Sequence, residues 1–217
     1  MLQRTRRALL LELSVPPPGE TNEFQTWYDR EHLPSRLGEP QVQAARRYQD
    51  IANADEWLAC YYLEESDSDE VNFVTSGELP RMGRDIVSRL VRFEQRRYER
   101  IDVPQVAHED EADETAVLMA VWWTPKPETV DDFNSWYDEE HIPMLMAVPG
   151  WNAIQRYRQV DGTGPAFLAL HYLDSIATLS EPAHKEAGKT RWRAISAQNR
   201  VQHERRIFRP YRTPSQP

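Results

Sequence analysis

The stretch DFNSWYDEEHIP (residues 132–143) decides the fold, because a close copy, EFQTWYDREHLP (residues 23–34), occurs 109 positions earlier in the same chain. The agreement extends past the motif. At this offset the identical pairs are Phe24 and Phe133, Trp27 and Trp136, Tyr28 and Tyr137, Asp29 and Asp138, Glu31 and Glu140, His32 and His141, Pro34 and Pro143, Arg47 and Arg156, and Tyr48 and Tyr157. With one extra residue in the second copy, WLACYYLEE (57–65) aligns with FLALHYLDS (167–175). Repetition over this length predicts a chain built from two similar units.

Each copy predicts the same series of elements. An apolar strand comes first, the aromatic helix follows a proline-rich turn, two more strands come next, and a long helix leads to a short closing strand. The predicted ranges are 8–15, 23–34, 43–49, 57–63, 76–99 and 98–103 in the first copy, and 116–123, 132–143, 152–158, 167–173, 180–206 and 207–212 in the second. The order β-α-β-β-α-β predicts an α+β fold of two ferredoxin-like units.

The predicted units span residues 1–105 and 116–217, and the acidic stretch VAHEDEADET (106–115) between them is predicted to be a solvated linker. A four-stranded antiparallel sheet with helices on one face leaves its other face uncovered. We therefore expect the two units of one chain to cover each other's sheets. Assembly into a homodimer is compatible with this arrangement.

The composition is that of a folded globular protein. Of the 217 residues, 40% are apolar and 28% are charged, which supplies a buried core. The formal net charge of −9 argues against nucleic acid and anionic membranes as partners. No apolar run approaches the roughly 18 residues of a transmembrane helix. Glu12 interrupts the N-terminal apolar segment and Cys60 is the only cysteine, so we expect a cytoplasmic protein.

The repeated motif places a carboxylate and a histidine on an aromatic helix face. Phe133, Trp136, Tyr137, Glu140 and His141 lie at i, i+3, i+4, i+7 and i+8, which is one continuous stripe. The proline that follows disfavours helical geometry before it, so the histidine is predicted near the helix C-terminus. A carboxylate and a histidine beside aromatic rings are a usual setting for general acid-base chemistry.

Two interpretations of this pattern stay open. In the first, the motif is catalytic, and the candidate residues are His141, Glu140, Tyr137, His32, Glu31 and Tyr28. In the second, the glutamate and histidine are packing anchors that bond to free helix carbonyls, loop amides or the arginines of the next strand. Presence of the pair in both copies does not separate these interpretations, because a fold constraint would also be duplicated.

The candidate substrate-binding residues are Trp136, Trp27, Arg156, Arg47, His171 and Tyr61. The tryptophans are more typical of a core than of a substrate platform. The arginines alternate with tyrosines along a strand, so the two types point to opposite faces, and the sequence does not say which type faces the helices.

The two copies are expected to differ in activity. The second copy has His171 where the first has Tyr61. In the first copy Arg30 lies beside Glu31 and should hold it ionised, whereas Glu140 has only acidic neighbours, which should raise its pKa and that of the following histidine. We therefore expect the second unit to carry the working site.

Other motifs of catalysis are missing from the sequence. His184 and His203 fall on the polar last helix and are predicted to be solvated. There is no HExxH or CxxC spacing for a metal, no phosphate-binding glycine loop and no GxSxG turn. The sequence therefore predicts no metal site and no cofactor.

The stretch FNSWYDEEHIPMLMAVPGWNAIQRYR (133–158) resembles the signature of EthD-like proteins in the dimeric α+β barrel superfamily. The likeness covers about the first half of each unit and is looser in the first, which reads LGEPQVQAARRY (37–48). The resemblance implies a barrel of two paired sheets, a small-molecule pocket between sheet and helices, and His32 and His141 as functional positions. Superfamily relatives include muconolactone isomerases, polyketide cyclases, cofactor-independent monooxygenases and haem-binding peroxidase-like enzymes.

The leading hypothesis is a cofactor-independent enzyme that acts by general acid-base chemistry on a small apolar or aromatic carbonyl compound, as an isomerase, cyclase or lyase. One alternative is a cofactor-free monooxygenase. Another is a non-catalytic protein that binds a small molecule, because a shared fold does not choose among chemistries.

Overall fold

The computed structural model describes residues 6–65, 81–101, 116–161 and 164–211. The chain divides into two compact units, Met1–Glu99 with Tyr211–Pro217, and Arg100–Pro210. The predicted linker at 106–115 lies outside the described residues.

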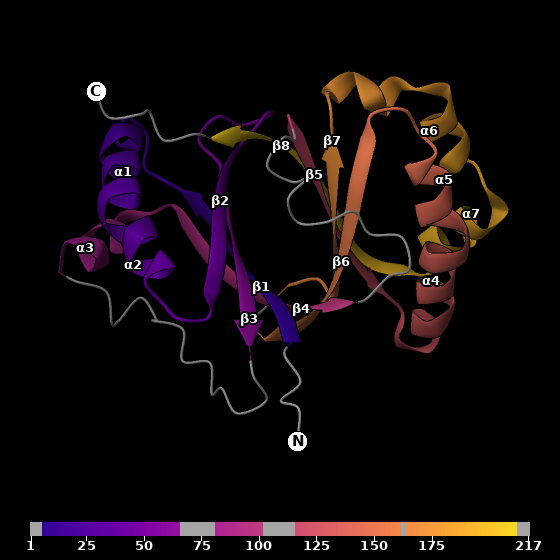
Figure 1. Cartoon of the computed structure of the whole chain (residues 1–217), viewed down its shortest axis with the longest axis horizontal. Coiled ribbons are helices and arrows are strands. Elements are labelled where there is room, and N and C mark those ends of the chain that lie inside the picture. The colour runs from indigo at the N-terminus through magenta and orange to yellow at the C-terminus, as the bar shows by residue number, and fades with distance from the viewer. Residues whose placement is uncertain (1–5, 66–80, 102–115, 162–163, 212–217) are drawn as a thin grey trace. The chain divides into compact units, whose positions relative to one another are not determined.

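The first unit is a four-stranded antiparallel sheet with helices on one face (Figure 1). Its strands are ordered β2-β3-β1-β4, and β1 and β3 pair from Arg6 opposite Glu65 to Ser14 opposite Trp57. The elements in chain order are β1 (Arg6–Val15), α1 (Thr21–Trp27), a π-helical turn (Tyr28–His32), α2 (Leu33–Leu37), β2 (Val42–Asp50), β3 (Trp57–Glu65), α3 (Arg81–Arg89) and β4 (Arg92–Ile101).

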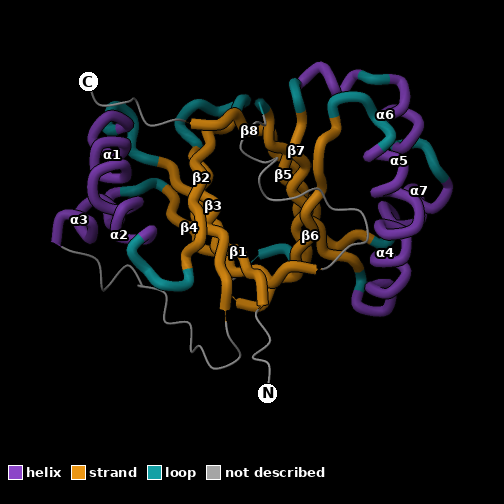
Figure 2. Tube along the Cα trace, in the orientation of Figure 1, coloured by secondary structure: helices purple, strands orange, loops and turns teal. Residues whose placement is uncertain are grey.

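The second unit has the same element order, with its strands in the order β6-β7-β5-β8. Helices α4 to α7 all lie on one side of this sheet (Figure 2). The elements are β5 (Val117–Pro125), a 3-10 turn (Pro127–Thr129), α4 (Val130–Trp136), a π-helical turn (Tyr137–His141), α5 (Ile142–Met146), β6 (Trp151–Asp161), β7 (Phe167–Leu173), a 3-10 turn (Ile176–Ser180), α6 (Pro182–Ala187), α7 (Arg191–Gln198) and β8 (Arg200–Tyr211). The predicted α+β class and ferredoxin-like order are confirmed.

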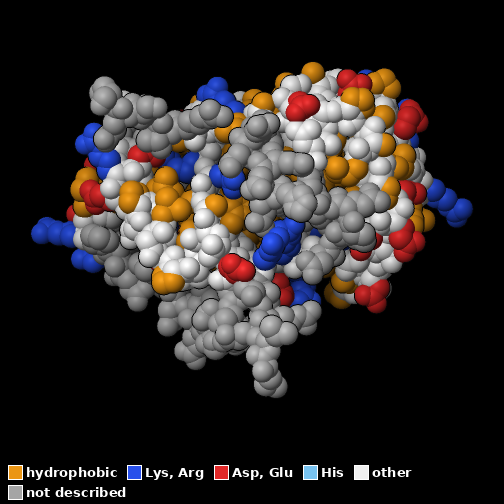
Figure 3. Space-filling model, in the orientation of Figure 1, with side chains coloured by type: hydrophobic (Ala, Val, Ile, Leu, Met, Phe, Trp, Pro, Cys, Tyr) orange, Lys and Arg blue, Asp and Glu red, His pale blue; other side chains and the backbone are white. Residues whose placement is uncertain are grey.

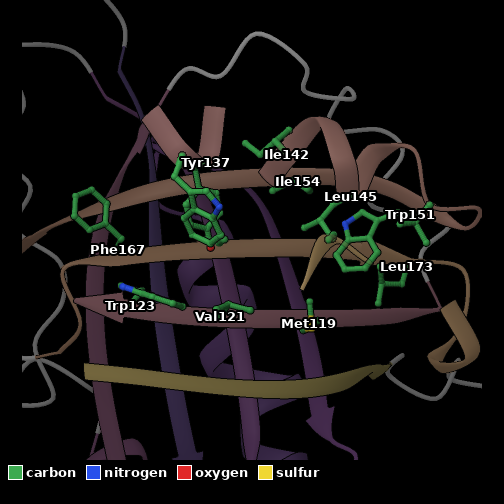
Figure 4. Close-up of a cluster of buried hydrophobic side chains, with 14 of the residues drawn as sticks. Met119, Val121, Trp123, Tyr137, Ile142, Leu145, Trp151, Ile154, Phe167 and Leu173 are labelled. Carbon is green, nitrogen blue, oxygen red and sulfur yellow. The ribbon is translucent and has the colours of Figure 1, made fainter. Parts of the chain in front are cut away.

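The period-2 pattern of the strands positions the core of each unit. Along β5, every second side chain, namely Val117, Met119, Val121 and Trp123, belongs to one buried cluster with Phe133, Trp136, Tyr137, Ile142 and Leu145. Figure 4 shows Met119, Val121 and Trp123 on the strand with Tyr137, Ile142 and Leu145. Gly150, in the turn before β6, has φ +80°, and a Cβ there would come within 2.8 Å of Thr178 Oγ1. Only glycine fits this turn without strain.

The structure corrects the predicted long helices. Residues 92–99 and 200–206, predicted as helix, belong to strands β4 and β8, so Phe93 and His203 lie on strands. The apolar spacing from Ile86 to Leu90 does fit a short helix. Beyond it, β4 pairs with β1 along its length, and this non-local pairing overrides the local helical pattern.

The aromatic helix also differs from the prediction, because it does not end at His141. It continues into α5 with Pro143 in its first turn, and the π-helical turn Tyr137–His141 lies immediately before. A proline inside an α-helix removes one i→i−4 hydrogen bond and clashes with the carbonyl four residues earlier. The wider i→i+5 turn accommodates both effects.

No helix of the described chain is long and apolar enough to cross a membrane.

Candidate functional site

A cavity of about 270 Å³ lies in the second unit between the sheet and the helices. Its residues come from β5, α4, the π-helical turn, α5, β6, β7, α6, α7 and β8, and they are Met119, Val121, Trp123, Trp136, Tyr137, His141, Leu145, Trp151, His171, His184, Lys185, Gly188, Arg193, His203 and Arg205. Figure 4 shows Met119, Val121 and Trp123 in a row on β5, facing Tyr137 and Leu145. An engineered apolar cavity of about 150 Å³ holds benzene, so this one holds a compound of about two fused rings.

The π-helical turn brings His141 against the aromatic wall. The imidazole stacks on Trp136, with ring centroids 4.4 Å apart and an interplanar angle of 25°, and it meets Tyr137 edge-on at 5.2 Å. Trp136 and His141 are five positions apart, which is the spacing that an i→i+5 turn aligns. The turn therefore points the histidine into the cavity and keeps it off the solvent side of the helix.

His141 is held neutral. Burial lowers its pKa to about 3, and Arg193, His184 and Arg156 add to the effect by repelling a second positive charge. The prediction of a raised pKa is wrong, because burial and the positive charges of other elements act on His141 more strongly than its acidic neighbours in sequence. Its Nδ1 is buried and has no hydrogen-bond partner among the described residues.

A second neutral histidine, His171, lies deeper on β7. Its side chain is 1% exposed, and it meets Trp151 edge-on at 5.3 Å. Both ring nitrogens are buried without a partner in the described part of the chain. Burial, with His141, His184 and Arg205 contributing, lowers the pKa of His171 well below its usual value. The structure thus brings His141 and His171 together in one cavity.

Two histidines that the sequence predicted to be solvated also line the cavity. His184, on α6, packs against Trp151 at 5.3 Å and shares a hydrogen bond of 2.7 Å between its Nδ1 and the carbonyl oxygen of Leu179. His203, on β8, meets Trp123 edge-on at 5.0 Å. Burial and nearby arginines lower the pKa of His203 to about 4. The sequence assigned His203 to a helix, whereas it lies on strand β8, and there its side chain is exposed.

The charged residues that line the cavity are all basic, namely Lys185, Arg193 and Arg205. The guanidinium of Arg193 lies 5.5 Å from the centre of the Trp123 ring. Burial is the largest cause of its lowered pKa. The lining contains no aspartate or glutamate. By contrast, acidic side chains lie scattered over the outer side of the second unit in Figure 3.

Glu140 has a positioning role in this structure. Its Oε1 accepts hydrogen bonds from Trp136 Nε1 at 3.2 Å and from Thr190 Oγ1 at 2.5 Å, and Glu140 is not among the residues that line the cavity. Thr190 is the N-cap of α7, where its Oγ1 also accepts the backbone N–H of Arg193 at 3.1 Å. Glu140 therefore links the aromatic helix to the start of the helix that carries Arg193.

The arginine, and not the tyrosine, of the RY pair faces the helices in both units. Arg156 is 1% exposed, bonds to Asp138 at 3.0 Å and Asn134 at 2.8 Å, and lies 4.1 Å from the centre of the Tyr137 ring. Arg47 repeats this with Asp29, Gln25 and Tyr28. Arg156 is absent from the lining of the described cavity. It supports Tyr137 from behind.

In the first unit the candidate residues converge on a buried carboxylate that the motif did not include. Glu12 is 0% exposed. Its Oε2 lies 2.6 Å from Tyr28 Oη, 2.8 Å from His32 Nε2 and 3.2 Å from Tyr61 Oη. Its Oε1 accepts hydrogen bonds from Arg36 at 3.2 Å and Gln95 at 2.9 Å. The sequence signal was a single carboxylate inside the apolar strand ALLLELSV (8–15).

The Glu12 carboxylate is ionised, and neighbouring side chains of the first unit contact both of its oxygens. Burial alone would raise the pKa of Glu12, but His32 and Arg36 hold it well below its usual value. Burial and the Glu12 charge raise the pKa values of Tyr28 and Tyr61 well above normal, so both phenols stay protonated as donors. Glu31, predicted to orient His32, is exposed. Trp27 is core, with its ring centroid 4.7 Å from that of His32.

The cavity does not fit a haem. A tetrapyrrole is several times larger than the benzene that fills about 150 Å³. Among the described residues, no group of three or more His, Cys, Asp and Glu side chains is placed to hold a metal ion.

No protein-family model and no curated protein matches the chain. Solved structures do match its fold. An anthrone oxidase-like protein has a TM-score of 0.66 at 10% identity, covering 95% of this chain and 92% of that one. A ferredoxin-fold protein from Listeria monocytogenes, related to antibiotic biosynthesis monooxygenases, has 0.55 at 10%, covering 97% of each chain. A variant of chlorite dismutase from Candidatus Nitrospira defluvii has 0.63 at 8%, covering 98% and 93%.

These likenesses show the fold. The neighbours are proteins of the ferredoxin-fold and dimeric α+β barrel type, so the fold part of the resemblance is confirmed. Their names are those of enzymes or of proteins related to enzymes, and an enzyme is consistent with this fold. The narrower EthD-like assignment stays a prediction.

Proposed function

We propose that the second unit is a cofactor-independent enzyme site that removes a proton from a small aromatic ketone and lets the resulting carbanion react with molecular oxygen. The observation that carries this proposal is His141, a half-buried neutral imidazole whose buried Nδ1 has no partner among the described residues, in a cavity whose charged residues are all cations. The monooxygenase and oxidase names among the structural neighbours support this reading over the isomerase and lyase alternatives.

His141 acts as the general base. A pKa of about 3 keeps it unprotonated at neutral pH, so it is ready to accept a proton whenever substrate is bound. A low pKa also makes it a weak base in the empty site. The largest electrostatic cause of that low pKa is Arg193. When negative charge develops on the substrate, that charge attracts both the imidazolium and Arg193, so both are stabilised in the transition state.

The tryptophans of the cavity exclude water, and Arg193 and Tyr137 stabilise the enolate oxygen. Trp123, Trp136 and Trp151 line the cavity with flat apolar surface and exclude water from the carbanion. Arg193, which no carboxylate neutralises among the described residues, stabilises the enolate oxygen. Tyr137, whose pKa burial raises, stays protonated and can donate a hydrogen bond to the same oxygen.

Oxygen supplies the oxidant, and the atoms balance without a cofactor. The carbanion passes one electron to O₂, and the radical pair combines into a carbon-bound peroxide. The peroxide takes back the proton held by His141 and loses water as the second C–H proton leaves, which converts CH₂ into C=O. The net reaction is CH₂ + O₂ → C=O + H₂O.

The predicted isomerase, cyclase and lyase chemistry starts with the same proton transfer. It differs in that the proton returns to another atom and no oxygen is consumed. A non-catalytic binding protein would use the same apolar walls without turnover. Oxygen uptake therefore separates the proposal from both alternatives.

The test uses 1-naphthol as substrate, because its keto tautomer is an aromatic ketone with a reactive CH₂ and the two fused rings that a cavity of about 270 Å³ holds. Oxygen uptake is measured by electrode and quinone formation by absorbance, after subtraction of the reaction without protein. We expect equimolar oxygen and quinone, and a loss of roughly 10²–10⁴-fold in turnover for His141→Ala. The matched variant His32→Ala changes the equivalent histidine of the first unit and should retain turnover if circular dichroism shows it folded. If His32→Ala abolishes activity and His141→Ala spares it, the working site is in the other unit.

A further inference from the structure

The strand pairing of the two units is equivalent around Glu12 on β1 and Val121 on β5. In the first unit Glu12 on β1 lies opposite Gln95 on β4. In the second unit Val121 on β5 lies opposite Arg205 on β8. Because β1 and β5 occupy the same place in the two sheet orders, Val121 is the counterpart of Glu12, and Arg205 is the counterpart of Gln95.

The partners of Glu12 also have counterparts around Val121. Tyr28, His32, Tyr61 and Gln95 all bond to the Glu12 carboxylate. Their counterparts are Tyr137, His141, His171 and Arg205, and all four line the cavity of the second unit. Only Arg36 is replaced by an apolar residue, Leu145. The second unit therefore keeps a set of groups that in the first unit surrounds a carboxylate.

In the second unit the carboxylate itself is missing. Val121 cannot accept a hydrogen bond, and the cavity of about 270 Å³ lies beside it. His171 has both nitrogens buried without partners among the residues that the structure describes, and His141 has one. Polar groups buried without partners are costly and call for a ligand, a water or an ion.

We propose that an anionic oxygen of the ligand takes the place that the Glu12 carboxylate fills in the first unit. The ligand is then an aromatic compound of about two rings that carries a carboxylate or an ionised enol or phenol. This inference rests on the proposed function, since it names the class of substrate for the same cavity. The hydrogen bonds around the Glu12 carboxylate in the first unit therefore indicate how the corresponding groups of the second unit would contact the ligand's anionic oxygen.

The charges around the cavity favour the same class. Lys185, Arg193 and Arg205 line it without a carboxylate among them, although the whole chain has a net charge of −9. Arg193 is half-buried against Trp123, and Arg205 is exposed to solvent. The positive charge of Arg193 contributes to the lowered pKa of His141, and that of Arg205 contributes to the lowered pKa of His171. An anion between them would relieve this repulsion.

The test compares two probes of the same shape, 2-naphthoate and 2-naphthamide, in the full-length protein at 0.15 M salt. Trp123, Trp136 and Trp151 line the cavity, so quenching of intrinsic tryptophan fluorescence reports binding without any turnover. A charge-assisted hydrogen bond is stronger than a neutral one by an amount that makes naphthoate roughly 10- to 100-fold tighter than naphthamide. Equal dissociation constants for the two probes would overturn the inference.

Two variants locate the effect. Arg193→Gln and Arg205→Gln should each reduce the preference for naphthoate at least several-fold and leave naphthamide affinity nearly unchanged. The matched control is Arg191→Gln, which removes an exposed arginine of α7 outside the cavity lining and should keep the preference. If both cavity variants keep the preference, or if they weaken both probes equally, the anion does not occupy the proposed place. Because the readout is binding, this failure would leave the oxygen-uptake test of the proposed function unaffected.

Discussion

His141→Gln should make the protein less sensitive to mild acid. Glutamine keeps a polar side chain of similar size at the same place but does not titrate. In the wild type the folded state holds the pKa of His141 at about 3, whereas in the unfolded chain it returns to 6.5. Between these values the unfolded state binds more protons than the folded state, so stability is complete above pH 6.5 and falls as the pH falls towards 3.

The magnitude follows from the difference in protonation. One pKa unit corresponds to 1.36 kcal/mol, and pH 5.0 lies about 1.5 units below the unfolded pKa, so His141 costs about 2 kcal/mol at pH 5.0 and almost nothing at pH 7.5. This value changes little for any folded pKa below about 4, since the folded imidazole is then neutral at pH 5.0. Glu12 does not contribute in this window, because its pKa is lowered and it stays ionised in both states above pH 5.

The assay is urea unfolding followed by tryptophan fluorescence, for wild type and His141→Gln at pH 7.5 and pH 5.0. The free energy of unfolding should fall by about 2 kcal/mol less in the variant than in the wild type over this pH change. Taking the difference of the two pH effects removes the contribution of every other titrating group that the substitution leaves alone. If the two proteins lose the same free energy, His141 is not buried in its neutral form.

Three further predictions follow from the same contacts. Val121→Glu should place in the second unit the carboxylate that Glu12 provides in the first. It should abolish naphthoate binding and raise the pKa of His141 from about 3 by at least two units in an NMR titration. The neutral Val121→Gln should fill the same space without raising that pKa. Glu12→Gln should lower the free energy of unfolding by about 3–5 kcal/mol, since it leaves buried Arg36 and His32 without their anion. Glu31→Gln, at an exposed position, should change the free energy of unfolding by less than about 0.5 kcal/mol. Equal effects of the two substitutions would show that Glu12 is not the centre of the network. Separate expression of residues 1–106 and 112–217 should not yield stable soluble monomers by ultracentrifugation, because each half would expose an apolar sheet face; two well-behaved monomers would contradict the predicted pairing of the units.

The sequence predicted most of the fold because the deciding signals are local. Alternating apolar strands, the aromatic stripe and the proline-glycine turn each specify their own element, and repetition indicates that the same series of elements occurs twice. The predicted closing strand at 98–103 covers only the end of β4, and residues 92–97 were predicted as helix. Their partner is β1, more than 70 residues away, and the apolar spacing up to Leu90 is that of a helix. The same error hid His203, which reaches the cavity only as a strand residue.

The candidate site was predicted in part. His141, Tyr137 and Trp136 do line the cavity with His171, but Glu140 and Arg156 turn out to support these residues from behind. A periodic stripe shows which side of a helix is buried, but not what lies opposite. Burial is the largest cause of the low pKa of His141, and the arginines that lower it further come from α7 and β6. No sequence pattern places those elements against the motif.

The Glu12 network bears on the stoichiometry of the chain. Although the motif occurs in both units, the Glu12 side chain already supplies the anion in the first unit. A saturating titration with naphthoate should therefore end at one ligand per chain. A ligand present at 100 times its dissociation constant stabilises the structure that binds it by about 2.7 kcal/mol, and one site per chain gives this amount once. In calorimetry, saturating ligand should therefore raise the melting temperature of the whole chain by the shift of a single site, and not by that of two.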